Sequence, residues 1–265
     1  MRAIIIAAGQ GTRLRPFTDD RPKTMVEVGL GAKRRPILHH QIAAYRAAGV
    51  HDIVVIRGYK GQQIQLPSSQ NGSKGGGNQG VRLVDNTDFA HNNILESLFC
   101  AGPLLCGDVI VSYGDILFHP GIVKGLMGIH TPATLVVDRM WARTYEGRTD
   151  HPVEQAELCR INNYGLVSRV GKAVGPDGAV GEFIGLARFG AAVVARMWAR
   201  WQRALARGPE QPYGTAPSLR RAYLTDMLNE AIEDGEYIAP LGIEGHWREI
   251  DTVQDLERAH AAVTW

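Results

Sequence analysis

Residues 2–18 read RAIIIAAGQGTRLRPFT, an apolar run that ends in two closely spaced glycines. A short, continuous apolar run followed by glycine is typical of a strand buried on both faces of a sheet. Apolar residues then recur at helical spacing over 35–48 until Gly49, and DIVVIR at 52–57 has the pattern of a second buried strand. This order of strand, loop, helix and strand predicts an α/β protein with a parallel sheet.

The remaining pattern extends this arrangement to the end of the chain. Turn signals Asn-Asn, Pro-Asp-Gly and Gly-Glu divide residues 156–189 into three short strand-like pieces, so we expect the sheet to become mixed or antiparallel there. Ser218 is expected to cap a helix that Gly235 ends. The other expected strands cover 81–84, 108–113, 133–137 and 237–241, an extended piece covers 247–250, and helices cover 92–105, 121–129, 191–206, 218–234 and a final segment from about 252.

Composition and charge exclude several classes of protein. The chain has 265 residues, 45% of them hydrophobic, and a formal net charge of +2. These values predict a globular core and exclude bulk disorder, and the balanced charge gives no basis for nucleic-acid binding. No apolar run is long enough to span a membrane, so we expect a cytoplasmic protein. Cys100, Cys106 and Cys159 lack redox or metal-ligand spacing and are expected to be reduced, mostly buried thiols; the histidine spacing likewise predicts no zinc site.

Residues 67–80 are nearly all Gly, Ser, Asn and Gln. They carry little apolar surface to offset the entropy lost on ordering, so the sequence predicts a mobile loop within one domain. A surface insertion is the expectation, with an active-site lid as the alternative.

The turn after the first strand carries the strongest chemical signal. Backbone N–H groups of a glycine-rich turn at the carboxyl end of a parallel strand can approach phosphate oxygens. Arg13 and Lys23 follow at positions where their charge would add to this site. Two glycines alone would equally fit a tight strand-to-helix turn.

Two aspartates are candidates for a divalent-cation site. Asp115 follows the buried strand at 108–113, and the carboxyl end of a central strand is the functional edge of an open α/β sheet. Asp251 precedes the last expected helix. Taken alone, Asp115 fits a turn residue and Asp251 fits a residue beside the positive end of a helix capped by Thr252.

Together these segments resemble one family. Gly9-x-Gly11-x-Arg13-x-x-Pro16-x-Thr18, followed after four positions by Lys23, matches the signature of the nucleotidyltransferases similar to sugar-1-phosphate nucleotidylyltransferases. The third glycine of a dinucleotide-binding motif is missing, and no Gly-Lys-Ser/Thr of a P-loop follows. The resemblance implies a Rossmann-like nucleotide-diphospho-sugar-transferase fold, with a mixed, mostly parallel central sheet and helices on both faces. We expect one domain, 1–265, with a nucleotide-binding half (1–131) and an acceptor-binding half (132–265) that carries the C-terminal metal-ligand element.

The resemblance also implies roles for individual residues. Lys23 and Arg13 would be catalytic and bind phosphates, and Asp115 and Asp251 would hold Mg²⁺. The nucleotide would contact Ala7, Ala8, Gly9, Gly11, Thr12, Asn92, Asn93, Ser97 and Gly114. The strings YGDILF (113–118) and GEFIGL (181–186) resemble the branch of cytidylyltransferases that activate 2-aminoethylphosphonate or phosphocholine.

The implied reaction is transfer of CMP from CTP to a small phosphonate or phosphate monoester, with release of pyrophosphate. A positively charged aminoalkyl acceptor calls for carboxylates or aromatic faces. Asp138, Trp141, Tyr164 and Glu182 are the candidates, and Thr225 and Asp226 could also reach that pocket. A sugar-1-phosphate nucleotidylyltransferase using UTP or dTTP, and a catalytically silent nucleotide-binding regulator, are the alternatives. Assembly into a homo-oligomer is left open.

Overall fold

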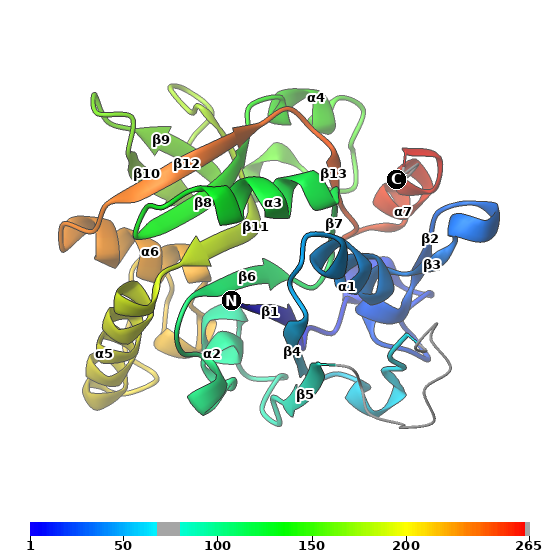
Figure 1. Cartoon of the computed structure of the whole chain (residues 1–265), viewed down its shortest axis with the longest axis horizontal. Helices are drawn as coiled ribbons and strands as arrows, with labels where there is room; N and C mark the ends of the chain where they lie inside the picture. Colours follow the sequence, from blue (N-terminus) through cyan, green and yellow to red (C-terminus); the bar gives the residue numbers. More distant parts are fainter. Residues whose placement is uncertain (68–79, 263–265) are drawn as a thin grey trace.

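A nine-stranded mixed sheet forms the centre of the protein (Figure 1). The computed structural model describes residues 1–67 and 80–262. The strand order is β10-β9-β11-β6-β1-β4-β5, and β8 lies between β11 and β12 off this path. The strands are β1 (Arg2–Ala7), β4 (Asp52–Arg57), β5 (Val81–Asp85), β6 (Val109–Tyr113), β8 (Ala133–Asp138), β9 (Leu158–Ile161), β10 (Val167–Gly171), β11 (Gly181–Phe189) and β12 (Ile238–Ile243).

The sheet is parallel around β1 and becomes mixed at β11. β1 pairs in parallel with β4 and β6, and β4 pairs in parallel with β5. β11 runs antiparallel to β6, β8 and β9, and β10 runs antiparallel to β9. β10 and β11 therefore run in the direction opposite to all the other strands of this sheet. The predicted mixed, mostly parallel sheet is confirmed.

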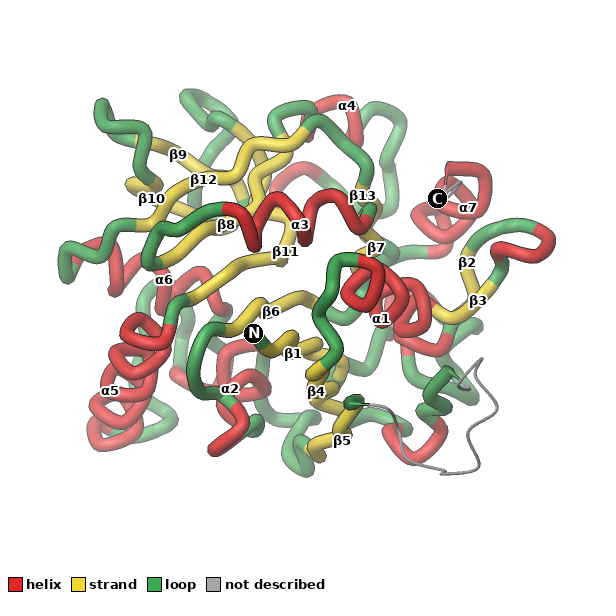
Figure 2. Tube along the Cα trace, viewed as in Figure 1, coloured by secondary structure: helices red, strands yellow, loops and turns green. Residues whose placement is uncertain are grey.

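Helices cover both faces of the sheet (Figure 2). They do so because successive apolar side chains along the central strands point to opposite faces. Ile5, Ile53 and Ile110 face one side, where they pack with α1 (Ile37–Ala47) and α3 (Pro120–Gly128). The residues next to them along the strands face the other side, where they pack with α2 (Ile94–Phe99), α5 (Ala191–Arg207) and α6 (Leu224–Glu233). Successive strand residues point to opposite faces, so continuous apolar runs supply both layers of the core.

A small two-stranded ribbon joins distant parts of the chain. β7 (Ile116–Phe118) pairs antiparallel with β13 (Trp247–Glu249). Beyond it, α7 (Val253–Ala262) packs Leu256 on a separate apolar cluster that includes Leu14 and Ile250. A second ribbon pairs β2 (Glu27–Val28) with β3 (Arg35–Pro36). A short helix, α4 (Trp141–Tyr145), was not predicted.

Two predicted helices are shorter than expected. The expected helix at 92–105 ends at Phe99, and a 3₁₀ turn over Gly102–Leu104 follows, since glycine and proline do not continue an α-helix. The expected helix at 218–234 divides into a 3₁₀ turn over Leu219–Arg221 and α6. Ser218 makes no capping hydrogen bond; instead the carboxylate of Asp226 accepts the backbone N–H of Tyr223 at 2.8 Å.

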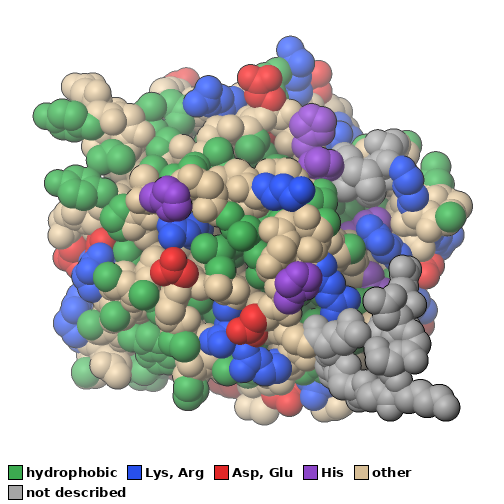
Figure 3. Space-filling model, in the orientation of Figure 1, with side chains coloured by type: hydrophobic (Ala, Val, Ile, Leu, Met, Phe, Trp, Pro, Cys, Tyr) green, Lys and Arg blue, Asp and Glu red, His purple; other side chains and the backbone are tan. Residues whose placement is uncertain are grey.

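Basic and acidic side chains are interspersed over the face shown in Figure 3, in keeping with the nearly balanced charge. No helix among residues 1–67 and 80–262 is long and apolar enough to cross a membrane. Cys159 is buried, but Cys106 is exposed and Cys100 half-buried, so the expectation of mostly buried thiols is wrong for Cys106. Most of the predicted loop at 67–80 lies outside the described residues.

Candidate active site

A cavity of about 320 Å³ opens at the carboxyl ends of β1 and β6. This is the edge where ligands bind in open parallel sheets. The backbone after β1, the turn after β6, and side chains from β11 and β13 line it. Among the residues predicted from the sequence, those lining the cavity are Ala7, Ala8, Gly9, Gly11, Thr12, Arg13, Lys23, Asn92, Asn93, Ser97, Gly114, Asp115, Glu182 and Asp251.

The glycine turn is packed directly against Lys23. Gly11 has a φ of +60°, and a Cβ added there would lie 2.9 Å from Cβ of Lys23. Thr18 fixes the turn because its hydroxyl donates to the carbonyl of Gly11 at 2.9 Å. A glycine is thus required both for the left-handed backbone and for the close approach of the lysine stem.

Lys23 lies between the two predicted aspartates. Its Nζ is 2.8 Å from Oδ2 of Asp115 and 2.7 Å from Oδ1 of Asp251. Arg13 forms a further ion pair with Oδ2 of Asp251, and its guanidinium remains half-exposed. The structure therefore brings together four charged residues that are far apart in the sequence.

The β7–β13 ribbon brings Asp251 to Asp115. Glu249 pairs with Ile116, and the backbone N–H of Ile250 donates to the carbonyl of Asp115 at 2.9 Å. On the other side of the turn, buried Gln41 donates to the carbonyls of Tyr113 and Ile116. Both aspartates are thus carried by backbone that is hydrogen-bonded on either side.

A buried ion-pair network supports this ribbon. Arg148 donates through Nε to Asp255 at 2.6 Å and through Nη2 to Glu249 at 2.7 Å. Asp255 in turn accepts the backbone N–H groups of Asp251 and Thr252 at the start of α7. The direction of the chain at Asp251 is therefore set by a charged residue more than a hundred positions away.

The charges of the cluster reinforce one another. Burial alone would lower the pKa of Lys23, but the adjacent carboxylates of Asp115 and Asp251 outweigh burial and raise it. Burial alone would raise the pKa of Asp251, but the charges and hydrogen bonds of Lys23, His151 and Arg13 hold it well below its usual range. The lysine is therefore a fixed cation and Asp251 a fixed anion at neutral pH.

Two of the three polar residues predicted near the nucleobase form a network around Asn86, which was not predicted from the sequence. Asn86 donates to Oδ1 of Asn92 at 2.8 Å and to Oγ of Ser97 at 2.9 Å. Asn93 instead caps α2, because its Oδ1 accepts the N–H of Ile94, and its amide donates to the carbonyl of Arg221. Asn86, on the loop after β5, thus orients two of the three residues.

Two buried glutamates also line the cavity. Glu182 is buried on β11, where Oε1 accepts the hydroxyl of Tyr145 at 2.7 Å and Oε2 has no partner. Burial, reinforced by the charge of Glu249, raises the pKa of Glu182 to about 8. Nearby, burial raises the pKa of Glu157 to about 7, although the hydroxyl of Tyr113 donates to it at 2.9 Å. Such carboxyl groups hold protons at neutral pH unless a cation approaches.

Three of the predicted acceptor residues do not line the cavity. Tyr164 lies in the turn between β9 and β10 and is 88% exposed. Asp138 is buried, but its oxygens accept N–H groups from Met140, Gly245 and the indole of Trp247. Trp141 packs on a small apolar cluster around Ala156.

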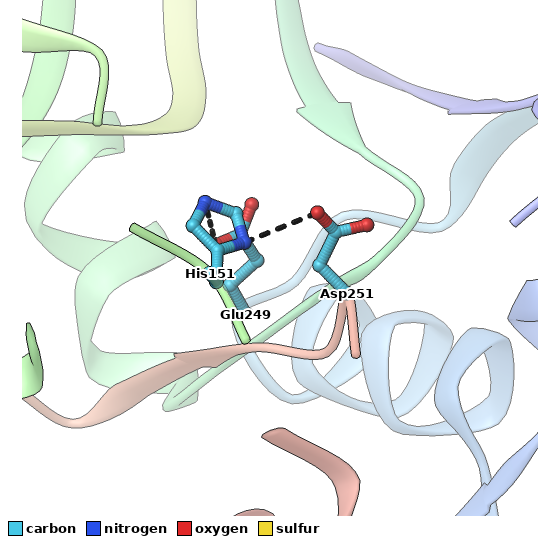
Figure 4. A group of neighbouring side chains, drawn as sticks. All are labelled: His151, Glu249 and Asp251. Carbon is cyan, nitrogen blue, oxygen red and sulfur yellow. Dashed lines mark ion pairs between the residues drawn. The ribbon is translucent and has the colours of Figure 1, made fainter. Parts of the chain in front are cut away.

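Thr225 and Asp226 also remain outside the cavity, although their side chains are buried and not on a solvated face. Thr225 donates to Glu157, and Asp226 holds the start of α6. The charged or polar residues that line the cavity without having been predicted include His151, Glu157, Lys172, Tyr223 and Glu249 (Figure 4 shows His151 and Glu249 beside Asp251). Of these, Glu249 carried a sequence signal, because it stands two residues before Asp251.

Comparisons with known proteins agree with this geometry. The model of the nucleotidyl transferase family matches residues 2–101, which contain the glycine turn and Lys23. The chain is 28% identical over 263 residues to CTP:phosphoglutamine cytidylyltransferase of Campylobacter jejuni, a match that covers 97% of this chain and 98% of that protein. It is 35% identical over 118 residues to choline-phosphate cytidylyltransferase of Streptococcus pneumoniae (44% of this chain, 46% of that one). It is also 28% identical over 141 residues to CMP-5'-(3-aminopropyl)phosphonate synthase of Streptomyces rubellomurinus (52% of this chain, 21% of that one).

The fold has a close counterpart among solved structures. The CTP:phosphocholine cytidylyltransferase of Streptococcus pneumoniae superposes with a TM-score of 0.73 at 22% identity, covering 99% of both chains. The α/β architecture of the chain is therefore shared with that structure along its whole length. The chain thus resembles the nucleotidyl transferase family over residues 2–101, and along nearly its whole length it is similar to a cytidylyltransferase.

Proposed function

We propose that this protein is a cytidylyltransferase that joins CMP to a small phosphonate or phosphate monoester carrying a cationic amine. 2-Aminoethylphosphonate is the first candidate acceptor, and phosphocholine is the second. The observation that carries the acceptor class is Glu182, a buried carboxylate in the cavity with one oxygen lacking any partner. The three relatives described above are all named for CMP transfer or CTP use, which supports the base.

In the proposed reaction an oxygen of the acceptor attacks the α-phosphorus of CTP. The bond from the α-phosphorus to the bridging oxygen breaks, and pyrophosphate leaves. Because the reaction moves highly charged groups in line, the protein's contribution is to position two anions and neutralise charge. Lys23 and Arg13 are the cations placed to do this.

The aspartates fit a divalent cation of the expected kind. Oδ1 of Asp115 is buried and has no hydrogen-bond partner, and Asp251 presents its own carboxylate across Nζ of Lys23. Mg²⁺ binds through one or two carboxylates together with substrate phosphates. When bound, Mg²⁺ would polarise a phosphoryl oxygen as a Lewis acid. Asp115 and Asp251 would hold the ion. Lys23 would then break its ion pairs with these two carboxylates and bind the phosphates.

The nucleotide end is proposed to read the base through Asn92 and Ser97. Asn86 already uses part of their hydrogen-bonding capacity. A hydroxyl has two lone pairs, so Ser97 keeps one acceptor position beside its bond from Asn86. Asn92 also donates to Oδ1 of Asn86 at 3.1 Å, so it would have to exchange a present partner for the base. Ala7, Ala8 and Gly9 also line the cavity, and their backbone groups would contact the base and ribose. Gly11, Thr12 and Gly114 line it as well and would also contact the nucleotide.

A matched pair of acceptors tests the proposal. Pyrophosphate release and the phosphorus NMR spectrum of the product are measured with each of the four nucleoside triphosphates and Mg²⁺. The acceptors are 2-aminoethylphosphonate, phosphocholine, glucose 1-phosphate and ethylphosphonate, which lacks only the amine. We expect turnover with CTP and the amine-bearing acceptors, and at least about tenfold weaker kcat/KM with ethylphosphonate.

Three other outcomes of this experiment would change the function assigned to the protein. Turnover with UTP or dTTP and glucose 1-phosphate would identify a sugar-1-phosphate nucleotidylyltransferase and remove the role given to Glu182. Equal rates with ethylphosphonate would show that no cation is recognised. Nucleotide binding with no turnover for any pair would favour a silent regulatory protein.

A further inference from the structure

A buried asparagine lies behind the part of the cavity that is proposed to bind the base. Asn86 follows β5, is only 2% exposed and does not line the cavity. Its side chain contacts the two residues proposed to read the base, Asn92 and Ser97, and both of these do line the cavity. Asn86 can therefore affect a bound nucleotide only through these two neighbours.

A backbone group fixes the orientation of the amide of Asn86. The backbone nitrogen of Asp88 is 3.1 Å from Oδ1 of Asn86, and a backbone N–H can only donate. The atom of Asn86 that accepts this bond must be the oxygen, so the other side of the amide is the NH₂ group. That group donates to Oδ1 of Asn92 at 2.8 Å and to Oγ of Ser97 at 2.9 Å. The loop backbone therefore decides the direction of both hydrogen bonds.

This orientation determines the hydrogen-bonding roles of the two neighbours. Nδ2 of Asn92 donates back to Oδ1 of Asn86 at 3.1 Å, so the two amides form a reciprocal pair and neither can be turned over alone. Ser97 accepts from Asn86, which leaves its hydroxyl hydrogen to donate elsewhere. The distance from this hydroxyl to Oδ1 of Asn92 is 3.5 Å, which is too long for a strong hydrogen bond. Asn86 thus makes Ser97 a donor and Oδ1 of Asn92 an acceptor.

A donor beside an acceptor is complementary to cytosine and not to uracil. Cytosine carries an acceptor at N3 next to a donor, its N4 amino group, whereas uracil carries a donor at N3 next to an acceptor, O4. The hydroxyl of Ser97 can donate to N3 of cytosine. Oδ1 of Asn92 can then exchange its long contact with that hydroxyl for a hydrogen bond from the amino group. With uracil, the same two contacts would place donor against donor and acceptor against acceptor.

We propose that Asn86 is a positioning residue that sets the preference of the cavity for cytosine over uracil. It lies outside the cavity and acts by holding Ser97 as a donor and Asn92 as an acceptor. This role rests on the proposed function, because it concerns the base of the nucleotide that the cavity is proposed to bind. Its test measures nucleotide binding without an acceptor, so the result does not depend on turnover.

The first experiment reverses the hydrogen bond between Asn86 and Ser97. Asn86→Asp keeps the shape of the side chain and an oxygen for the N–H of Asp88, but its second oxygen accepts and does not donate. The hydroxyl of Ser97 would then donate to the new carboxylate and no longer to N3. Calorimetry of the full chain with CTP and with UTP, in Mg²⁺ and without acceptor, should show the ratio of the two affinities falling by at least about tenfold.

The ratio is the readout because repulsion between the added charge and the phosphates is the same for both nucleotides. Asn163→Asp makes the same change of charge at an exposed position in the turn between β9 and β10, and it should leave the ratio unchanged. An unchanged ratio in folded Asn86→Asp would overturn the proposal.

The second experiment needs no variant of Asn86. 3-Deazacytidine triphosphate has a C–H group in place of N3 and keeps the amino group. The wild type should bind it at least about tenfold more weakly than CTP, and Ser97→Ala should bind the two nucleotides about equally. Equal binding of both by the wild type would show that no donor is held against N3, and the role given to Asn86 would be wrong.

These results separate the role of Asn86 from the proposed function. A lower ratio in Asn86→Asp without turnover of any acceptor would leave the role of Asn86 standing and refute the proposed function. Turnover of CTP by the wild type, together with an unchanged ratio in Asn86→Asp, would do the reverse.

Discussion

Replacing Glu182 by glutamine should stabilise the protein, and by an amount that depends on pH. Burial and the neighbouring charge of Glu249 raise the pKa of Glu182 from its ordinary value of 4.5 to about 8. Between these two pH values the native protein keeps a proton that the unfolded chain has lost. Stability therefore falls as the pH rises through this window, and glutamine, which does not titrate, removes that loss.

The size of the effect follows from the window. Each pH unit is equivalent to about 1.4 kcal/mol, so the 2.5 units from 4.5 to pH 7 correspond to about 3 kcal/mol. The free energy of unfolding of Glu182→Gln, minus that of the wild type, should grow by about that amount between pH 4.5 and 7. For a chain of this length, 3 kcal/mol corresponds to about 6 to 12 °C in Tm. Above pH 8 the difference should stop growing.

Urea denaturation of both proteins at pH 5, 6, 7, 8 and 9 measures this difference. Glu257→Gln, at an exposed position on α7, is the control and should show a difference that is constant with pH. A difference for Glu182→Gln that is equally flat would refute the reasoning, because it would mean that the buried carboxyl titrates as it does in the unfolded chain. The same variant should lose most of the preference for 2-aminoethylphosphonate over ethylphosphonate, which links its cost in stability to substrate recognition.

Three other changes have defined outcomes. Lys23→Ala should lower pyrophosphate release by about 10²–10³-fold while calorimetry shows that CTP binding is largely kept, since the buried cation acts on charge that develops in the reaction. Arg148→Ala removes the arginine from buried Asp255 and half-buried Glu249 and should cost about 3–5 kcal/mol in urea denaturation, against less than about 1 kcal/mol for Arg203→Ala on the surface of α5. Gly185→Ala should lower Tm and raise the KM for the acceptor, because φ is +75° and a Cβ would collide with the ring of Tyr113.

Contrary results would be equally informative. An unchanged rate for Lys23→Ala would remove its catalytic role. Equal costs for the two arginine variants would mean that the ribbon carrying Asp251 is held by its backbone alone. A Tm unchanged in Gly185→Ala would show that the bend in β11 can relax away from the cavity.

Local sequence predicted the elements whose signals are local. The run from Ala3 to Ala7 is apolar throughout and belongs to a central strand, and the predicted glycine turn follows it, with a positive φ at Gly11. Helix ends were predicted less well. Pro103 and Gly102 ended α2 early, and the cap of α6 is formed by Asp226, not by Ser218, because the chain first makes a 3₁₀ turn.

Side-chain roles in the second half depended on contacts that the sequence does not display. Asp138 and Glu182 are opposite each other on β8 and β11, and both are buried acids. The carboxylate of Asp138 accepts hydrogen bonds from three N–H groups, one of them the indole of Trp247. One carboxylate oxygen of Glu182, in contrast, has no hydrogen-bond partner. The sequence pattern does not distinguish these two acids. They differ because Asp138 is bound by a tryptophan about a hundred residues away, whereas Glu182 lines the cavity.

The sequence by itself determined the edge of the sheet that carries the candidate active site. The glycine turn, Lys23 and Asp115 each follow directly from a strand or turn whose pattern is contained in a few neighbouring residues. Only the tertiary structure decided which distant residues lie beside that edge. The pairing of β13 with β7 places Asp251 and Glu249 there, and the loop that contains His151 and Arg148 places His151 beside Asp251. Backbone propensity acts over a few residues, whereas these contacts depend on the burial of charges and on strand pairing between segments that only packing brings together.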